Sequence, residues 1–434
     1  MRDIKGLTFA LCLLTASTIY AQNWKNYTTE NSKIGGNTIL ALATDNKNNL
    51  WVGTNVGLCS HKGNSWTDYA QFNKKLANQY VNCITVDQNG NIWIGTDDYG
   101  PIVFDGKNWT EYLQETQRFN MKLIHSIAID VDDVKWISIT LNGLVRFDGH
   151  DWEKFTPDDS ELTSDFILCT AIDRANRKWI GTNAGLCLYN GRRWSVYTTK
   201  NSPLPSDITP AIAIDGDNVK WIGTIDGLVR FDGENWTTYN TGNSILPSNQ
   251  INDLAIDAMG RLWIATSKGL AIFDRKNRWA AFTSANSPLP KDASVQVLAI
   301  DKQGTAWIGT DFYGLISLDG FAFPDPAAEA AAKAAAEARQ KEEEAAKLAA
   351  SQPKEKATLN VKVTPYLELG YVVFTFDGDE KATIEFLNRD GEVVRTVSNY
   401  SSGSRIGITK IPKGNYTLRI NTPSAEKIMK FNLK

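Results

Sequence analysis

The chain has 434 residues, of which 42% are hydrophobic and 22% charged, so it can bury a large core and is not disordered throughout. Its 46 lysines and arginines nearly balance 49 aspartates and glutamates. That balance excludes a dominant basic face for nucleic acid and gives no reason to invoke an anionic membrane surface. Three histidines argue against a histidine-rich metal site.

The first 21 residues are predicted to be a secretory signal peptide. Arg2 and Lys5 supply the positive start, residues 7–19 are mostly apolar, and Ala21 is a small residue before the cleavage point. A buried N-terminal helix is the alternative. No later run of eighteen apolar residues occurs, so we expect an exported protein without a membrane span, in the periplasm, on the outer-membrane surface or secreted.

The fourteen tryptophans reveal an internal repeat. One set of seven recurs with steps of 42 to 44 residues: Trp51, Trp93, Trp136, Trp179, Trp221, Trp263 and Trp307. The other seven recur with steps of 42 or 43 residues: Trp24, Trp66, Trp109, Trp152, Trp194, Trp236 and Trp279. Every tryptophan of the chain therefore belongs to the repeat.

Each repeat is predicted to hold four short strands. In residues 208–239, for example, four segments with a period of two are separated by turn residues such as Asp232-Gly233. Four antiparallel strands in about 40–45 residues are typical of a propeller blade, whereas a helical solenoid would need a period of 3.6. The sequence thus predicts an all-β, seven-bladed β-propeller over residues 22–323.

The two ends of the repeat array are predicted to complete one blade together. The last repeat has Phe323 where its fourth-strand tryptophan should stand, and Pro324 and Pro326 follow, which cannot donate to a strand ladder. Trp24 and Tyr27 form a fourth strand without a repeat of its own. We therefore expect the first strand to close the last blade, which leaves no open edge in the ring.

The repeats share a sequence motif. It begins as in Trp221-Ile222-Gly223-Thr224, and Gly-Leu, Asp-Gly, Trp and Tyr follow in that order later in the same repeat. It resembles the two-component regulator propeller repeat of Bacteroidota-type bacteria and covers about residues 23–323. In that family such blades often form the periplasmic sensor of hybrid histidine kinases that detect oligosaccharides. This sequence has no kinase, receiver or membrane-spanning segment, so the resemblance implies ligand binding without phosphotransfer.

Residues 324–356 are predicted to be an Ala-rich helical linker. Alanine, glutamate and lysine favour helix, and Glu329 and Lys333 form an i,i+4 pair. Few large apolar residues are present, which favours a solvated spacer over a partner-binding helix.

Residues 357–434 alternate again and predict a small Ig-like β-sandwich. The ending, residues 414–418 and 427–434, is similar to the C-terminal sorting domain of type IX secretion cargo, which implies the type IX secretion machinery as a partner. The usual Pro-Asn-Pro opening is missing, and a plain accessory sandwich is the alternative.

Residues that recur in every blade are interpreted as structural. Cys169 and Cys187 fall on the first and third strands of one blade, about 9–10 Å apart and beyond the reach of a disulfide, so we expect buried thiols. The tryptophans and tyrosines are expected to pack between blades. One aspartate ends each first strand and is expected to form a turn: Asp45, Asp87, Asp130, Asp173, Asp215, Asp257 and Asp301.

Departures from the repeat point to a ligand site on the face that carries the turns between second and third strands. Two of these turns are one residue longer than in most repeats and contain acidic and aromatic residues. A third lengthened turn contributes Asn142, and a long neighbouring loop contributes Arg118. The candidate ligand-binding residues are Asp97, Asp98, Tyr99, Asp311, Phe312, Tyr313, Asn142 and Arg118. Aromatic rings stack on sugars and carboxylates accept hydroxyl bonds, so this set suits a glycan. The alternatives are ordinary loop variation and calcium, for which no recognised loop pattern is present.

Catalysis has little support in the sequence. His61 and His150 fall near turns of the opposite face and His125 lies within a first strand, so no histidine-based acid–base pair or metal site is expected. We therefore predict an exported, non-catalytic glycan-binding protein without a cofactor. A protein scaffold of the envelope would instead show a broad apolar patch, and an enzyme would show clustered carboxylates with perturbed pKa values.

Overall fold

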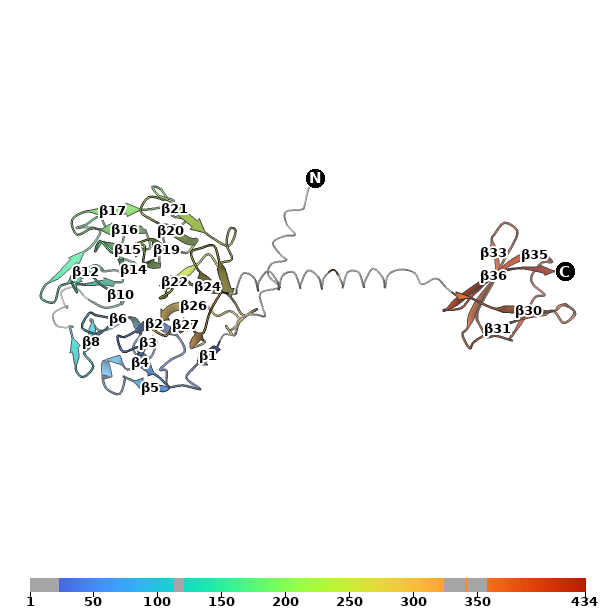
Figure 1. Cartoon of the computed structure of the whole chain (residues 1–434), viewed down its shortest axis with the longest axis horizontal. Coiled ribbons are helices and arrows are strands. Elements are labelled where there is room, and N and C mark those ends of the chain that lie inside the picture. Colours follow the sequence, from blue (N-terminus) through green and yellow to red (C-terminus); the bar gives the residue numbers. More distant parts are fainter. Residues whose placement is uncertain (1–22, 113–120, 324–340, 342–356) are drawn as a thin grey trace. The chain divides into compact units, whose positions relative to one another are not determined.

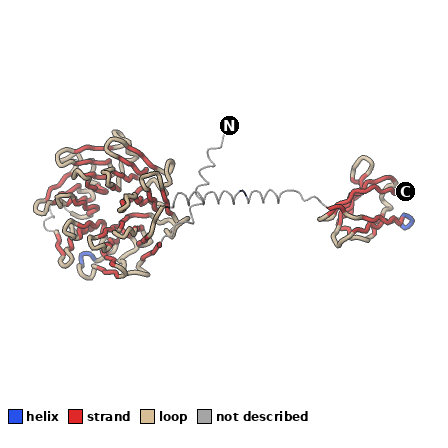
Figure 2. The backbone as a smooth tube through the Cα atoms, viewed as in Figure 1, coloured by secondary structure: helices blue, strands red, loops and turns tan. Residues whose placement is uncertain are grey.

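The computed structural model describes residues 23–112, 121–323, 341 and 357–434. The predicted signal peptide and, apart from residue 341, the predicted linker lie outside these residues. The chain divides into two compact units, residues 1–331 and 332–434. Strands dominate the described backbone of both units, as Figure 2 shows, and the prediction of an all-β chain is confirmed.

The described part of the first unit contains seven four-stranded antiparallel sheets that resemble propeller blades. Six of them are built from consecutive strands: β2 (Ile39–Thr44), β3 (Leu50–Thr54), β4 (Gly57–Lys62), β5 (Ser65–Asp68); β6 (Val81–Val86), β7 (Ile92–Thr96), β8 (Ile102–Phe104), β9 (Trp109–Glu111); β10 (Ile124–Ile129), β11 (Lys135–Ile139), β12 (Gly143–Phe147), β13 (Trp152–Phe155); β14 (Ile167–Ile172), β15 (Lys178–Thr182), β16 (Gly185–Tyr189), β17 (Trp194–Tyr197); β18 (Ala211–Ile214), β19 (Lys220–Thr224), β20 (Gly227–Phe231), β21 (Trp236–Tyr239); β22 (Ile251–Ile256), β23 (Leu262–Thr266), β24 (Gly269–Phe273), β25 (Trp279–Phe282). A short 3-10 helix, η2 (Lys74–Leu76), lies between β5 and β6.

The seventh sheet combines the two ends of this unit. It contains β26 (Val295–Ile300), β27 (Ala306–Thr310), β28 (Leu315–Asp319) and, beside β28, the first strand β1 (Asn23–Tyr27). Trp24 is paired with Leu318 and Tyr27 with Leu315 in an antiparallel register. The prediction that the first strand completes the last sheet is therefore confirmed.

The first strands of the seven sheets pack against one another in a circular order. Contacts run from β2 through β6, β10, β14, β18 and β22 to β26, and β26 contacts β2 again. Figure 1 shows these strands near the centre and fourth strands such as β5, β17 and β21 at the outside. The turns between second and third strands share one face with the loops that lead to each first strand; we call it the upper face. The remaining turns form the lower face.

One hydrogen-bonded unit recurs in all seven sheets. The aspartate after the first strand accepts bonds at Oδ1 from the backbone N–H groups two and four residues later. Its Oδ2 accepts a bond of 2.8–3.2 Å from the indole N–H of the second-strand tryptophan. The turn-forming role is thus confirmed, and the structure adds the bond to the indole.

The aromatic residues pack within and between sheets, as expected. The ring of Trp179 stacks on Tyr197 of its own sheet and meets Phe231 of the next sheet edge to face, with centroids 5.9 Å apart in both pairs. The four described cysteines are free. Burial raises the pKa of the Cys59, Cys83 and Cys169 thiols to about 12, so they behave as small apolar groups.

The second unit consists of two sheets. The larger has the order β29-β36-β35-β32-β33 and the smaller has the order β30-β31-β34. Phe374, Phe386 and Leu418 are fully buried in the core of this unit. Its elements are β29 (Ala357–Thr358), β30 (Val361–Tyr366), η4 (Leu367–Leu369), β31 (Tyr371–Phe376), β32 (Ala382–Leu387), β33 (Val393–Tyr400), β34 (Arg405–Gly407), β35 (Gly414–Asn421) and β36 (Ala425–Leu433).

We predict that Asp173→Ala lowers the free energy of unfolding by about 3 kcal/mol, because it leaves the buried Trp179 indole N–H without its acceptor and removes the carboxylate that faces the buried Lys220 ammonium. The measurement is denaturant unfolding monitored by tryptophan fluorescence. Asp232→Ala is the matched control, since Asp232 makes the same type of turn bonds in an exposed hairpin. Equal losses in the two variants would contradict a special role for the indole bond.

Candidate functional site

Each first strand of the first unit carries an irregularity at its upper end. In six sheets the register to the second strand shifts around the second residue of the first strand, which leaves that residue as a bulge. In the remaining sheet a proline stands at the equivalent place, directly before β18. Bulges redirect a side chain out of the regular alternation. We call these seven residues the bulge ring: Leu40, Asn82, His125, Leu168, Pro210, Asn252 and Gln296.

The residues of the bulge ring are accessible to solvent, whereas the residue that precedes each of them is not. The residue before each ring member is 0% exposed: Ile39, Val81, Ile124, Ile167, Thr209, Ile251 and Val295. His125 is exposed and the other six ring members are half-buried. Because the first strands lie nearest the centre (Figure 1), the ring surrounds the centre of the upper face.

The ring is polar on one side and apolar on the other. Asn252, Gln296, Asn82 and His125 come from β22, β26, β6 and β10, which follow one another around the circle with only β2 and its Leu40 between them. The opposite arc, at β14 and β18, has Leu168 and Pro210. A ligand at the centre of the upper face would therefore meet hydrogen-bonding groups on one flank and apolar groups on the other.

The first predicted acidic turn reaches this ring. Asp97, in the turn between β7 and β8, accepts a 2.6 Å bond at Oδ1 from the Asn82 carboxamide. The same carboxamide donates to the backbone carbonyl of Ile124 in the next sheet. The Asp97 carbonyl accepts from the backbone N–H of Leu123, two residues before His125. Asp97 thereby joins the ring members of two neighbouring sheets.

His125 lies close enough to Asp97 to interact electrostatically. Although the His125 side chain is accessible to solvent, the surrounding sheets partly desolvate the imidazole and so lower its pKa, and the negative charge of Asp97 partly opposes this effect. The sequence placed His125 only within a first strand, and the structure adds its proximity to one acidic turn. Strand alternation does not reveal that a bulge turns this side chain toward the upper face.

The second predicted acidic turn is tied to the ring in the same way. Asp311, between β27 and β28, accepts a bond at Oδ1 from the backbone N–H of Ser294. The Ser294 hydroxyl accepts from the carboxamides of Gln296, at 2.9 Å, and Asn252, at 3.1 Å. The sequence pointed to Asp97 and Asp311, but it did not point to the amides that connect them to the centre.

The other predicted residues have different surroundings. Phe312 is 70% and Tyr313 37% exposed, and Asp98 is also exposed. Tyr99 is half-buried and packs against the core between two sheets, with Lys75 Nζ 5.4 Å from its ring centroid. Its ring is therefore mainly a packing residue and offers little free surface to a ligand.

Two predicted residues stand apart from these clusters. The Asn142 side-chain oxygen accepts a bond from Lys154 of β13, the fourth strand of its sheet. Arg118 lies outside the described residues.

Asp253 is a further titratable group beside the ring that the sequence interpretation missed. It follows the ring member Asn252, and its carboxylate accepts bonds from the backbone N–H groups of Leu298, at 2.7 Å, and Leu254, at 2.8 Å. Desolvation nevertheless raises its pKa to about 6. The signal was available in the repeat, because the other six sheets carry small or apolar residues here: Ala41, Cys83, Ser126, Cys169, Ala211 and Val297.

Within the described ranges, no group of three or more histidine, cysteine, aspartate or glutamate side chains is placed to hold a metal ion. The same residues include no helix whose length and hydropathy suit a membrane crossing.

The two component regulator propeller family matches this chain over residues 33–56, 75–98 and 245–268. These segments lie within the repeat and include strands of three of the sheets. No curated protein sequence matches the chain.

Solved structures with the same fold come from bacterial surface and signalling proteins and from enzymes. The extracellular domain assigned to a hybrid two component system, BT3049 of B. thetaiotaomicron, has a TM-score of 0.61 and 16% identity and is matched over 94% of this chain and 57% of that chain. PorZ, a surface component of the type-IX secretion system of Porphyromonas gingivalis, has a TM-score of 0.54 and 15% identity, with 92% of this chain and 60% of that chain covered.

Virginiamycin B lyase of Staphylococcus aureus has a TM-score of 0.57 and 13% identity, with 69% of this chain and 100% of that chain covered. The chain spans less than two thirds of the length of the two bacterial surface proteins. At these identities the likeness concerns the fold alone.

We predict that the raised pKa of Asp253 makes stability depend on pH. Its contribution is complete below about pH 4, where the carboxyl is protonated in both states, and declines as the pH rises through about 6. Wild type should therefore lose on the order of 2 kcal/mol relative to Asp253→Val between pH 4.5 and 7.5. The substitution introduces the residue that Val297 supplies in the next sheet. A difference between the two proteins that does not change with pH, measured by denaturant unfolding, would show that Asp253 stays ionised.

Proposed function

We propose that this protein is an exported, non-catalytic binding protein that recognises a glycan on the upper face of a seven-bladed β-propeller. The β1–β28 pairing supports a closed ring of seven blades, because it gives the last sheet four strands, the same number as in each of the other six sheets. The face-to-face arrangement of a five-stranded and a three-stranded sheet supports a small Ig-like sandwich as the second unit.

The single observation that carries the glycan proposal is the two-sided bulge ring. A sugar presents hydroxyl groups around its edge and C–H groups on its faces. The carboxamide oxygens of Asn82, Asn252 and Gln296 can accept bonds from hydroxyls, and the arc of Leu168 and Pro210 suits the apolar face. The hydrogen bonds to Asp97 and Ser294 hold the amides in place before a ligand arrives, which reduces the entropy lost on binding.

The outer part of the same face offers a second contact. Phe312 exposes most of its ring beside the polar arc, in the turn that also holds Asp311. Exposed aromatic rings stack on sugar faces with little loss of conformational freedom. A glycan of two or more units could thus contact the ring at one end and Phe312 at the other.

A binding role without catalysis agrees with the chemistry of the ring. Its polar members are three amides and one imidazole, and amides neither donate nor accept protons in catalysis at neutral pH. The Asp97 carboxylate is held by the Asn82 carboxamide rather than by His125. The fold is also found in lyases, so the absence of catalysis remains part of the proposal.

Export and the type IX secretion machinery belong to the proposal as well. The N-terminal 21 residues suit a secretory signal, and the resemblance of the last strands to sorting domains suggests that machinery as a partner. PorZ, a structural neighbour, is itself a surface component of that system. The protein would then act in the periplasm, on the outer-membrane surface or outside the cell.

A protein partner on the same face is the second candidate. Leu141, Phe312, Tyr80 and Leu123 expose between 41% and 70% of their surface and all belong to upper-face turns or loops. If these side chains form one contiguous patch, that patch favours a protein contact over a sugar.

We predict that His125→Ala combined with Phe312→Ala weakens glycan binding at least tenfold and leaves the melting temperature nearly unchanged, because both side chains are exposed. The secreted chain would be applied to a broad glycan array, and the best ligand titrated calorimetrically with each variant. Met259→Ala is the control, since Met259 is an exposed apolar residue of a lower-face turn. Unchanged affinity in the double variant rejects the site, and silence across the array favours the protein partner.

A further inference from the structure

The junction between the seventh sheet and the β2–β5 sheet differs from the other six in how its aspartate is satisfied. At six junctions, Oδ2 of the repeat aspartate accepts from a second side chain besides the indole. Asn49 donates to Asp45 and Asn91 to Asp87, at 2.7 and 2.8 Å. Cations serve at the other four: Lys178 at Asp130, Arg177 at Asp173, Arg275 at Asp215 and Arg261 at Asp257.

Asp301 is the exception. Its Oδ2 accepts from the Trp307 indole at 3.1 Å, and no second donor side chain reaches it from the residues that the structure describes. Thr305 stands where Asn49 and Asn91 stand in their sheets, and it donates only its backbone N–H to Oδ1. Asp301 is half-buried, whereas the other six repeat aspartates are buried.

The residues that the next sheet places beside Asp301 include no cation and one departure from the repeat. At three junctions a lysine that begins the second strand of the next sheet extends over the preceding tryptophan: Lys135 over Trp93, Lys178 over Trp136 and Lys220 over Trp179. Leu50 occupies this position at the Asp301 junction, as Ile92, Leu262 and Ala306 do at three others. It is paired across the strands with His61, where five of the other six sheets have Phe or Tyr and the seventh sheet has Leu318. Leu50 therefore brings no ammonium group to Asp301, and His61 places a smaller ring here than Phe or Tyr does in those five sheets.

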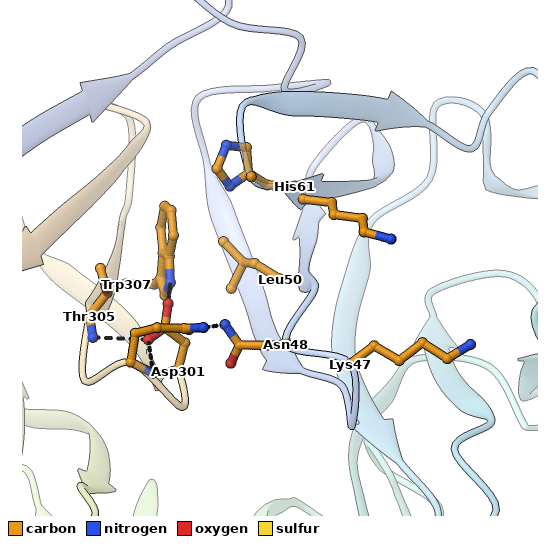
Figure 3. Close-up of a pocket in the computed structure, with 10 residues that line it drawn as sticks. Lys47, Asn48, Leu50, His61, Asp301, Thr305 and Trp307 are labelled. Carbon is orange, nitrogen blue, oxygen red and sulfur yellow. Dashed lines mark hydrogen bonds between the residues drawn. The ribbon is translucent and has the colours of Figure 1, made fainter.

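A cavity of about 360 Å³ lies at this junction, on the lower face. Figure 3 shows Asp301, Trp307, Leu50 and His61 around it, with the ammonium end of Lys47 directed away from Asp301. The imidazole of His61 packs on Trp66 and Trp307, and burial together with the charge of Lys25 lowers its pKa, so it is neutral at physiological pH. A carboxylate oxygen with an open acceptor site and a tryptophan face thus border the same space.

We propose that this cavity binds the primary ammonium group of an alkylamine, which is seated on Asp301 Oδ2 and over the Trp307 ring. The protein itself shows the geometry at an equivalent junction, where Lys178 Nζ lies 3.0 Å from Asp130 Oδ2 and 4.8 Å from the Trp136 centroid. The ligand supplies from outside the cation that the chain itself supplies at four other junctions, by a charged hydrogen bond and a cation–π contact like those of Lys178.

The surroundings restrict the ligand to a single positive charge. Lys47 and Lys62 also line the cavity, and their charges disfavour a second ammonium group near its opening. A free monoamine and the lysine side chain of a partner protein share this chemistry, and the cavity is independent of the glycan site proposed for the upper face.

The test is a titration of the full chain with n-butylammonium chloride, followed through the Trp307 indole N–H in ¹H–¹⁵N spectra, with sodium chloride at equal ionic strength as the reference. We expect a saturable shift with a dissociation constant on the order of 1–10 mM. A capped lysine tripeptide in a parallel titration distinguishes the sources: binding of both probes means that a protein lysine can enter, and binding of butylammonium alone means a free amine. Absence of a saturable Trp307 shift with either probe overturns the proposal.

Two substitutions should close the site from within. Leu50→Lys supplies the missing ammonium, and Thr305→Asn supplies the carboxamide that Asn49 gives to Asp45. Either variant should bind butylammonium at least tenfold more weakly and melt at a higher temperature than wild type. His150→Lys, in an exposed lower-face turn of another sheet, is the charge-matched control and should bind as wild type does. Undiminished binding in both closing variants also overturns the proposal, and the pair guards against one of them failing to fold.

Discussion

The hydrogen bond between the repeat aspartate and the second-strand tryptophan is the interaction on which the first unit depends. A buried indole N–H needs an acceptor, and a buried carboxylate needs several donors. The aspartate meets both needs at once, because one oxygen closes the hairpin turn and the other receives the indole. The tryptophan ring is thereby fixed in the orientation that packs against the next sheet.

This bond explains why the two ends of a first strand differ in how much they vary between the seven sheets. The lower end must preserve the aspartate, the turn and the indole, and it does so in all seven sheets. The upper end needs only a buried residue followed by a bulge, so the bulged residue is free to differ. The variety of the bulge ring, from Leu40 to His125, is therefore available for recognising a ligand.

Both proposed sites arise where the chain departs from its own repeat. On the upper face, the bulge ring and the two lengthened turns differ between otherwise equivalent sheets, so that one side of the face is polar and the other is apolar. On the lower face, Asp301 is more exposed than its six counterparts, and among the described residues it lacks the second side-chain donor that each of them has. A repeat protein carries internal controls for this reasoning, since the other sheets show what a filled position looks like.

The sequence by itself determined the strand content, the four-stranded unit and the pairing of the first strand with the last sheet, because tryptophan spacing and turn residues are local signals. It also identified Asp97 and Asp311 as departures. Only the tertiary structure brought His125 beside Asp97, tied Ser294 to Asn252, and left Asp301 beside a cavity. The physical reason is that these relations join side chains of different sheets, and the bulges that direct them interrupt the alternation from which a sequence is interpreted.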